Sequence, residues 1–250
     1  MICESGLEIW VRNMNSIVVG DGNFRTQNKE FKSFYKTVGG NEGALCNYNT
    51  RLDTYGCGCA HDCSYCYAKS LLDFRGLWHP LSPSVADIDK IKKKIKRITP
   101  DVGVVRLGGM TDCFQLIEAI EEVTFQTIQA LNDAGIGYLI VTKSTLIGDK
   151  KYLDVLDKDL AHIQVSISST DFEFSKTYEH APSPLERIKV AEKLQSCGFD
   201  TAIRVAPYLA GHVDTDIVNN AAVDKILVEF LRGNTFIKRL FPDIGGMIIH

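Results

Sequence analysis

Four of the eight cysteines of this 250-residue chain fall in one short segment, from Cys57 to Cys66. Three of them, Cys59, Cys63 and Cys66, have the spacing C-x3-C-x2-C. Thiolates are the ligands that iron–sulfur clusters require, and a compact loop can place three of them on three irons of a four-iron cube. The fourth iron then has no protein ligand and is open to a small molecule. The spacing therefore predicts a [4Fe–4S] cluster with one open iron.

The alternative for the same cysteines is a structural zinc site made by Cys57, Cys59, Cys63 and Cys66. Zinc sites favour two C-x2-C pairs separated by a longer loop, and this sequence has one such pair. The bacterial ferredoxin run C-x2-C-x2-C-x3-C-P, which ligates all its irons, also differs. We therefore assign the cluster to three cysteines and expect Cys57 to pack at the end of the preceding strand. We expect His61 to be exposed or to donate a hydrogen bond to the cluster edge.

An open iron can chelate the amino and carboxylate groups of S-adenosylmethionine (SAM). One electron from the reduced cluster then breaks a C–S bond, and the 5′-deoxyadenosyl radical that forms can remove hydrogen from unactivated C–H bonds. The cysteine spacing matches the motif of the radical SAM superfamily, including an aromatic residue, Tyr65, just before the last cysteine. The sequence therefore predicts two cofactors, a [4Fe–4S] cluster and SAM.

Strand-like and helix-like segments alternate from about Leu52 onward, which is typical of βα units around a parallel sheet. The helix that begins at Ser183 has an N-cap, a proline at its first position and a capping-box glutamate, and Gly198 ends it. Further helices are predicted at residues 88–98 and 114–131. Strands are predicted at residues 52–55, 102–107, 136–142, 162–167 and 201–206, with a short sixth at 246–249 or just before it. Residues 1–48 fit this scheme poorly and are interpreted as an N-terminal extension that precedes a barrel of residues 49–250.

Several segments together resemble the spore photoproduct lyase-like family of radical SAM enzymes. They are the cluster loop and four later motifs, in the same order and spacing across residues 52–210: 56–68, 111–118, 141–144, 165–168 and 181–187. The resemblance implies an α/β fold, a partial (β/α)6 TIM barrel, with chemistry at the C-terminal ends of its strands.

The resemblance also implies where SAM binds. Gly108 and Gly109 occupy the place of the glycine-rich turn whose backbone receives the methionine amino group, and Tyr65, Thr111 and Asp112 belong to the same cofactor-binding motifs. An ordinary strand-to-helix turn is the alternative for the two glycines.

Polar residues after the later strands complete this expected SAM site. Lys143 would pair with the methionine carboxylate, or be a solvated loop lysine. Ser166 and Ser168 share one face of a strand and would hydrogen-bond the ribose or carboxylate, or fill the strand end. Arg204 would face the barrel mouth, or pair with a carboxylate inside the protein.

One cysteine has a separate expected role. In spore photoproduct lyase a cysteine returns hydrogen to the product radical, and the corresponding position here is Gly109 or Met110. Cys113, on the other side of Asp112, is therefore the candidate catalytic residue, with packing at the start of a helix as the alternative. Because the donor cysteine is displaced, simple photoproduct reversal is a minor expectation.

The resemblance favours a nucleobase or modified nucleotide in DNA or RNA as the substrate, and a flavodoxin or ferredoxin as reductant. The alternatives are a radical SAM enzyme for a peptide or small metabolite, and an iron–sulfur electron-transfer or metal-stabilised binding protein. The net charge of −3 gives no global signature of nucleic-acid binding. The basic run from Lys90 to Arg97 is interpreted as a solvated helix face, with phosphate contact as the alternative. Apolar stretches are short and no secretory signal is visible, so we expect a cytoplasmic protein without a membrane span.

Overall fold

The computed structural model describes residues 30–36, 48, 50–98, 103–231 and 235–240. Its centre is a seven-stranded sheet in the order β1-β2-β5-β6-β7-β8-β9. Every neighbouring pair from β2 to β9 is parallel, and β1 pairs antiparallel with β2 at one edge. The strands of this sheet are β1 Phe34–Lys36, β2 Thr50–Leu52, β5 Val105–Leu107, β6 Tyr138–Thr142, β7 Ala161–Ile167, β8 Asp200–Tyr208 and β9 Lys225–Phe230. A second, two-stranded sheet pairs β3 Tyr55–Gly56 with β4 Ser84–Val85.

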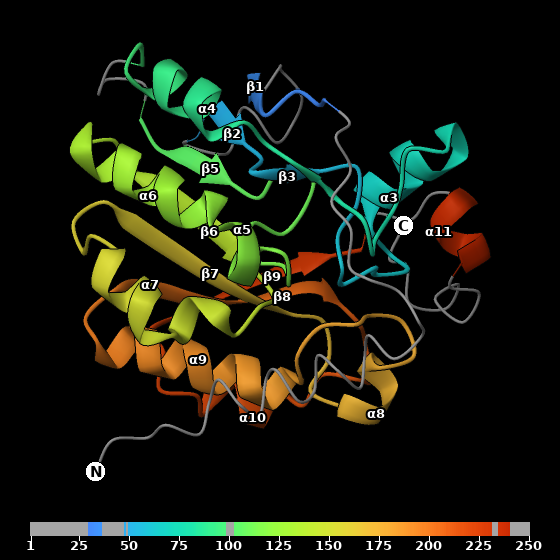
Figure 1. Cartoon of the computed structure of the whole chain (residues 1–250). Coiled ribbons are helices and arrows are strands. Elements are labelled where there is room, and N and C mark those ends of the chain that lie inside the picture. The colour runs from blue at the N-terminus through green and yellow to red at the C-terminus, as the bar shows by residue number, and fades with distance from the viewer. Residues whose placement is uncertain (1–29, 37–47, 49, 99–102, 232–234, 241–250) are drawn as a thin grey trace.

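Helices connect the parallel strands and cover the outer side of the curved sheet (Figure 1). The covering helices are α4 Ile88–Ile95, α6 Val123–Asp133, α7 Lys150–Val155 and α9 Pro184–Ser196. The shorter helices are α3 Tyr67–Leu72, η1 Asp73–Arg75, α5 Glu118–Glu121, η3 Leu146–Gly148, α8 Phe172–Ser175, α10 Thr215–Asn219 and α11 Thr235–Leu240. Six parallel strands alternating with helices confirm the predicted partial (β/α)6 barrel.

The predicted sixth strand was placed too far along the chain. The sixth parallel strand is β9 at Lys225–Phe230, paired with β8, whereas residues 246–249 lie outside the described residues.

The predicted continuous helix over 114–131 is also wrong, because the helix is interrupted at Glu122, which has a φ of 53°. The buried carboxylate of Glu118 accepts hydrogen bonds from the backbone N–H groups of Thr124 and Phe125, at 2.8 and 2.9 Å. It thereby satisfies free donors in the first turn of α6 and holds α5 and α6 as separate helices.

The capping signal at Ser183 is confirmed. The Ser183 hydroxyl accepts a hydrogen bond from the Glu186 N–H, and the Glu186 carboxylate accepts one from the Ser183 N–H. Pro184 stands at the first helical position. Local chemistry alone therefore sets the start of α9, which packs against β7 and β8.

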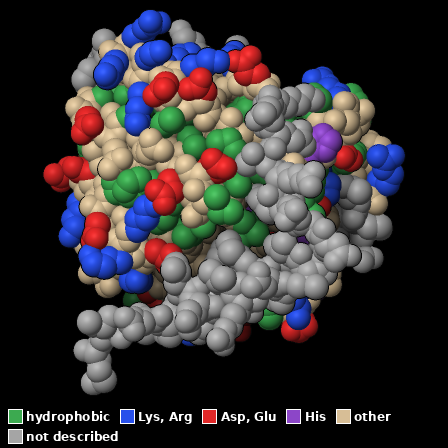
Figure 2. Space-filling view, viewed as in Figure 1, with side chains coloured by type: hydrophobic (Ala, Val, Ile, Leu, Met, Phe, Trp, Pro, Cys, Tyr) green, Lys and Arg blue, Asp and Glu red, His purple; other side chains and the backbone are tan. Residues whose placement is uncertain are grey.

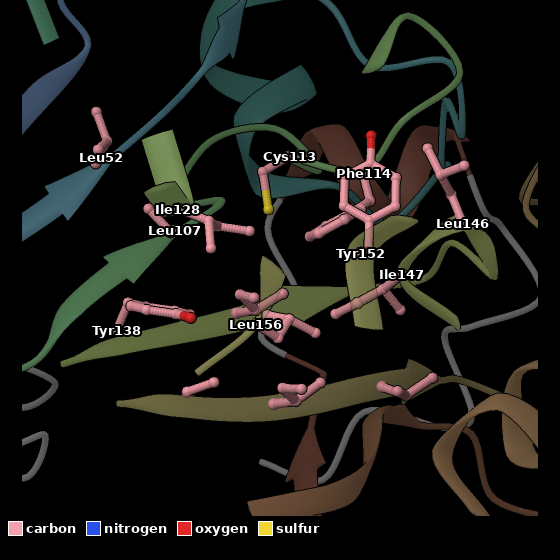
Figure 3. Packing of buried hydrophobic residues seen from close by; sticks show 14 of the residues in the cluster. Leu52, Leu107, Cys113, Phe114, Ile128, Tyr138, Leu146, Ile147, Tyr152 and Leu156 are labelled. Carbon is pink, nitrogen blue, oxygen red and sulfur yellow. The ribbon is translucent and has the colours of Figure 1, made fainter. Parts of the chain in front are cut away.

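The main core lies between the outer face of the sheet and the covering helices (Figure 3). Side chains alternate along the strands, so Leu107 and Ile140 are fully buried in this core. The intervening residues, such as Arg106 and Val141, face the barrel interior and line a cavity there. Outward-facing side chains such as Leu107 thus pack in the core, and inward-facing ones such as Arg106 line the cavity.

Little of the N-terminal extension is described. Residues 34–36 form β1, whose pairing with β2 adds an antiparallel edge to the barrel sheet. The boundary between an extension of residues 1–48 and a barrel of residues 49–250 stays a prediction.

The basic helix α4 has the expected amphipathic pattern, with Ile91 and Ile95 buried and Lys93 and Lys94 exposed. In Figure 2, Lys and Arg side chains gather along the upper edge, where Figure 1 places α4, with acidic side chains beside them. None of the helices in the described part of the chain is long and apolar enough to cross a membrane.

Candidate active site

A cavity of about 440 Å³ opens at the C-terminal ends of the parallel strands, within the size range of small-molecule sites. Cys59, Cys63 and Cys66 all line it. So do residues that lie in or directly after β5, β6, β7 and β8: Gly108, Gly109, Thr111, Asp112, Thr142, Lys143, Ser166, Arg204 and Pro207. The fold thus brings the cysteine motif and most of the predicted cofactor-binding residues to one cavity.

Gln115 fixes the conformation of the cysteine loop. This side chain is fully buried; its amide oxygen accepts a hydrogen bond from the Ala60 N–H at 2.9 Å, and its amide nitrogen donates to the Gly58 carbonyl at 3.3 Å. The loop also turns on itself through a bond from the Asp62 N–H to the Cys59 carbonyl and another from the Cys66 N–H to the Cys63 carbonyl. Gln115 therefore holds the segment that carries the first ligand against the start of the next crossover.

The three cysteines of the motif are free thiols in the structure, and burial raises the pKa of each. Thiols with a raised pKa are protonated at neutral pH, so binding a metal centre must displace their protons. Three soft sulfur donors on one cavity are the donor set that an iron–sulfur cluster needs, so the residues present fit this cofactor.

Two observations count against a zinc ion shared with Cys57. Among the described residues, no three His, Cys, Asp or Glu side chains are close enough to hold a single ion. A cluster avoids this requirement because each thiolate binds a different iron. Cys57 itself follows β3 with a φ of 56° and is not among the cavity-lining residues.

Asp112 connects the cysteine loop to the strand ends. Its carboxylate accepts hydrogen bonds from the Phe114 and Lys143 backbone N–H groups at 2.8 and 2.7 Å and from the Thr142 hydroxyl at 2.8 Å. His61 Nε2 lies 3.1 Å from the same carboxylate. Burial alone would raise the pKa of Asp112, but the interaction with His61 and the backbone N–H donors hold it below its ordinary value.

One of the two expectations for His61, an exposed side chain, is therefore wrong. Its side chain is 3% exposed and lies in the cavity wall against Asp112. Asp112, predicted to bind the cofactor, lines the cavity, but protein donors already engage its oxygens.

The turn after β5 requires glycine at one position. Gly108 has a φ of 77°, and a Cβ atom there would lie 3.1 Å from the Thr111 carbonyl oxygen and 3.2 Å from that of Val141. The Gly109 carbonyl accepts a hydrogen bond from the Tyr67 hydroxyl, and the Thr111 hydroxyl donates to the Tyr55 carbonyl at 2.7 Å. The turn is thus a fixed element of the cavity wall with its backbone facing the cavity.

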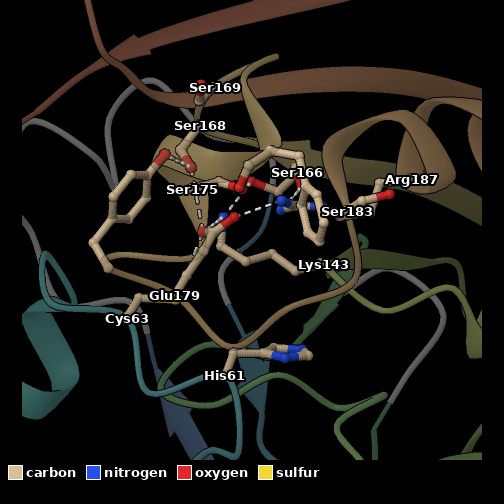
Figure 4. A network of polar contacts seen from close by, with 12 residues as sticks. His61, Cys63, Lys143, Ser166, Ser168, Ser169, Ser175, Glu179, Ser183 and Arg187 are labelled. Carbon is tan, nitrogen blue, oxygen red and sulfur yellow. Dashed lines mark hydrogen bonds and ion pairs between the residues drawn. The ribbon is translucent and has the colours of Figure 1, made fainter. Parts of the chain in front are cut away.

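Lys143 does not extend into solvent, because its side chain is only 13% exposed. Its Nζ lies 3.4 Å from Glu179 Oε2 and 3.4 Å from Ser166 Oγ, and 5.4 Å from the centre of the Tyr65 ring (Figure 4). The ammonium group therefore stands at the cavity wall, already beside one carboxylate.

Glu179 is the centre of this polar network, and it is not among the residues predicted from the sequence. Its carboxylate accepts hydrogen bonds from Tyr65 Oη at 2.5 Å, Ser168 Oγ at 3.2 Å and Arg187 Nη2 at 2.5 Å. Burial would raise the pKa of Glu179, but the cations of Arg187 and Lys143 outweigh it and lower the pKa to about 2. No local pattern marks Glu179, because its partner Tyr65 lies 114 residues away in the sequence and Arg187, eight residues away, is brought to it only by the fold.

For three predicted residues the structure shows the alternative that the sequence left open. Ser168 is fully buried beside Tyr178 and Glu179 and is not a cavity-lining residue. Arg204 does line the cavity, but it also donates to Gln164 at 2.8 Å and pairs with Glu229. Cys113 is fully buried in the hydrophobic core (Figure 3) and does not line the cavity, so the structure gives it the packing alternative.

Comparisons with known proteins agree with this geometry. The family model of the radical SAM superfamily matches residues 54–221. The chain therefore belongs to the radical SAM superfamily.

Individual relatives are distant. The uncharacterized protein ORF301 of Acidianus two-tailed virus is 26% identical over 163 residues, which cover 60% of this chain and 53% of that protein. Spore photoproduct lyase with bound S-adenosylmethionine and dinucleoside spore photoproduct superposes with a TM-score of 0.55 at 18% identity, over 78% of this chain and 61% of that chain. SuiB of Streptococcus suis, bound to its precursor peptide SuiA, superposes with a TM-score of 0.54 at 15% identity, over 73% of this chain and 39% of that chain. The chain thus spans 53% of the length of the viral protein and 61% of the length of spore photoproduct lyase. The structural likeness shows a shared fold.

Proposed function

We propose that this protein is a radical SAM enzyme that holds a [4Fe–4S] cluster on Cys59, Cys63 and Cys66 and acts on a nucleobase or nucleotide. The observation that carries the first half is the convergence of three thiols, a glycine turn and a partly buried lysine on one cavity. When bound, the cluster supplies one electron that cleaves SAM to methionine and a 5′-deoxyadenosyl radical.

The chain's own residues would bind and orient the cofactor. The backbone at Gly108 and Gly109 faces the cavity without side chains and would receive the methionine amino group. Lys143 would pair with the methionine carboxylate, and Ser166, hydrogen-bonded to it, would donate to the carboxylate or ribose. Glu179 and Tyr65 would keep the ammonium group at the cavity wall, because both contact Lys143.

The substrate half is supported by the sequence motifs shared with the spore photoproduct lyase-like family and by the fold of that lyase, which holds a dinucleoside in the structure named above. The position of Cys113 in the core argues against it as a hydrogen donor to a product radical. We therefore favour modification or rearrangement of a base, or of a group attached to one. A peptide substrate is the second candidate, favoured by the similar fold of peptide-bound SuiB. A flavodoxin- or ferredoxin-type protein would supply the electron.

The cluster assignment is tested by alanine substitution under anaerobic reconstitution. Cys59→Ala, Cys63→Ala and Cys66→Ala should each lose the iron, whereas Cys57→Ala, the matched control, should keep most of it. Loss of iron in Cys57→Ala as complete as in Cys63→Ala would refute the three-ligand assignment. With dithionite and SAM, the loaded protein should release 5′-deoxyadenosine without substrate. A loaded cluster that forms none under any reductant would favour the electron-transfer alternative.

The substrate is tested by deuterium transfer. Labelled nucleosides, oligonucleotides and peptides are incubated with the loaded protein, and label is measured in 5′-deoxyadenosine. Transfer from a base or sugar supports the proposal. Transfer from a peptide alone would refute the substrate half and leave the radical SAM assignment standing.

A further inference from the structure

Helix α3 lies directly against the cysteine loop. Its inner face packs on the loop, because Ala68 is fully buried beside Cys59 and Cys66. Cys66 is also the N-cap residue of α3, so the helix begins at a predicted cluster ligand. An α-helix with its side chains is about 10–12 Å across. A molecule that contacts the outer face of α3 would therefore be separated from the cysteines by about the thickness of one helix.

The outer face of α3 is apolar and exposed to solvent. Tyr67, Leu71 and Phe74, together called the α3 face below, follow one another at intervals of four and three residues, which places them on one side of a helix. Leu71 is 50% exposed, and Phe74, in the adjoining helix η1, is 69% exposed. Exposed apolar residues scattered singly are ordinary, whereas a group of them on one face is typical of a surface that binds another molecule.

Polar contacts hold α3 and the segment after it to the cysteine loop. Asp62, which lies between two of the cysteines, accepts a hydrogen bond from Trp78 Nε1 at 2.8 Å and pairs with Lys69 Nζ at 2.8 Å. The His79 N–H donates to the Cys57 carbonyl at 2.8 Å. The α3 face and the cysteines therefore belong to one structural unit, and a molecule docked on the face would keep a fixed position relative to the cysteines.

Basic side chains adjoin the α3 face. The Arg75 guanidinium group lies 5.0 Å from the centre of the Phe74 ring. Helix α11 packs beside α3 (Figure 1) and carries Lys238 and Arg239, both exposed. Within the described part of the chain, none of these three cations makes an ion pair with a carboxylate. These cations therefore stand free at the edge of an apolar surface.

The local charge has the opposite sign to that of the whole chain. The charged side chains of α3, η1 and α11 and of the adjoining Asp62 are four cations and two carboxylates: Lys69, Arg75, Lys238, Arg239, Asp62 and Asp73. Asp62 is paired with Lys69, and Asp73 balances one of the other cations, so two positive charges remain. The chain as a whole carries −3. The α3 face is therefore suited to a partner whose docking surface is acidic.

We propose that the α3 face is the docking site of the electron donor, a small acidic protein of the flavodoxin or ferredoxin type. This inference rests on the proposed function, in which each cleavage of SAM requires one electron. The docked donor gives up one electron and is oxidised, the cluster is reduced by that electron, and no atom is transferred. Because electron transfer slows steeply with distance, the donor must dock close to the cysteines. Electron-transfer interfaces are small, often below about 1,200 Å² in total, so a short apolar face with a basic edge is sufficient.

A strand of nucleic acid is the alternative occupant of an aromatic and basic surface. The α3 face favours a protein, because the aliphatic side chain of Leu71 offers no ring for a base to stack on. Two net positive charges are also few for a phosphate backbone, whose binding depends on neutralising several phosphates. Binding of a single-stranded oligonucleotide is therefore measured on the same variants.

The test measures binding and reduction with defined donors, an acidic flavodoxin and a [2Fe–2S] ferredoxin. Binding of each to the cluster-loaded protein is followed by calorimetry, and reduction of the cluster below saturation by rapid-freeze electron paramagnetic resonance. Leu71→Ala and Phe74→Ala should each lower the second-order rate constant of reduction about 10-fold, because each removes an apolar anchor of the docked donor. Arg75→Glu should lower it by a similar factor and weaken its dependence on salt.

Matched controls separate docking from effects on the cluster. Leu185→Ala makes the same change as Leu71→Ala on α9, where Leu185 is 48% exposed, and should leave the rate unchanged. Arg97→Glu makes the same change of charge as Arg75→Glu at an exposed arginine beyond α4 and should also leave it unchanged. Reduction by dithionite, which is small and needs no docking surface, should be the same in all variants.

The outcomes distinguish this inference from the proposed function. Variants of the α3 face that behave like Leu185→Ala and Arg97→Glu overturn the docking site, and so does equal slowing with flavodoxin and with dithionite. A wild-type cluster that dithionite reduces but neither protein binds or reduces also overturns it and leaves the proposed function standing. Loss of oligonucleotide affinity in Phe74→Ala with an unchanged reduction rate assigns the face to nucleic acid instead. A wild-type protein that takes up no iron overturns the proposed function and this inference together.

Discussion

Replacing Glu179 by glutamine should destabilise the folded protein substantially, and the structure sets the size of the effect. The Glu179 side chain is 1% exposed, and it is the carboxylate partner of Arg187, which is fully buried. Removing one member of a buried ion pair costs about 3–5 kcal/mol, because the remaining charge has no partner. The pKa gives a similar figure: lowering it from 4.5 to about 2 stabilises the folded state by about 3 kcal/mol at neutral pH, at about 1.4 kcal/mol per pKa unit.

The pH dependence of the stability difference between wild type and Glu179→Gln identifies the cause of that difference. Because the pKa of Glu179 is lower in the folded state, the carboxylate stabilises the fold fully above pH 4.5 and loses this effect as the pH falls toward 2. The difference between wild type and Glu179→Gln should therefore shrink from about 3 kcal/mol at pH 7 to about 1 kcal/mol at pH 3. Urea unfolding of the metal-free proteins, followed by circular dichroism at both pH values, measures it.

The matched control is Glu186→Gln, the same change in an exposed capping box where glutamine also functions, with an expected cost below about 1 kcal/mol. If Glu179→Gln is no more destabilising than Glu186→Gln, the buried pair does not stabilise this fold. If the difference is as large at pH 3 as at pH 7, the carboxylate is not the origin of the loss.

Three further perturbations probe the cofactor site and the local structure around it. Lys143→Ala should weaken SAM binding to the cluster-loaded protein by about 1.5–3 kcal/mol in calorimetry, the range for a hydrogen bond to a charged group; unchanged affinity would remove Lys143 from the site. Gly108→Ala should lower the free energy of unfolding by about 1–3 kcal/mol. It should cost more than Gly76→Ala, which has a similar positive φ but open space around its Cβ position, and equal losses would show that the close contacts at Gly108 relax. Ser183→Ala should cost about 1 kcal/mol in urea unfolding through the lost N-cap of α9, and Ser183→Thr should recover part of it.

Local patterns predicted those parts of the fold that local chemistry determines. The cysteine spacing, the capping box at Ser183 and the strands from β5 to β8 all depend on residues adjacent in the sequence. The split between α5 and α6 was missed because the apolar periodicity continues across it, while the cause is the buried carboxylate of Glu118 capping α6 from outside the helix. Strand β9 was missed although Ile226, Leu227 and Val228 are typical strand residues, because its largely exposed side chains give no alternation.

The residues of the candidate site also fall into two groups, those that the sequence predicts and those that it does not. The three cluster cysteines and the glycine turn were predicted from spacing and resemblance, and the structure brings them to one cavity. Gln115 could not be found from the sequence, because the two backbone groups that it binds lie more than 50 residues away. Glu179 was missed because its partner Tyr65 lies 114 residues away and Arg187, although only eight residues away, is brought to it by the fold. Cys113 was assigned by its proximity to Asp112 in the sequence, but consecutive side chains at the start of a crossover point in different directions. The thiol packs into the core while the Asp112 carboxylate faces the cavity.

The bonds to the Asp112 carboxylate make the cysteine loop and the end of β6 parts of one cooperative unit. Through one side chain, His61 in the loop shares an anchor with Thr142 and Lys143, about 80 residues further along the chain. A local opening of the loop must release that anchor, so its free energy includes the loosening of β6. Ligands that stabilise the closed loop oppose this opening in both places. Iron loading should therefore slow hydrogen exchange at the Lys143 amide, whose hydrogen bond ends on the Asp112 carboxylate rather than on any cysteine.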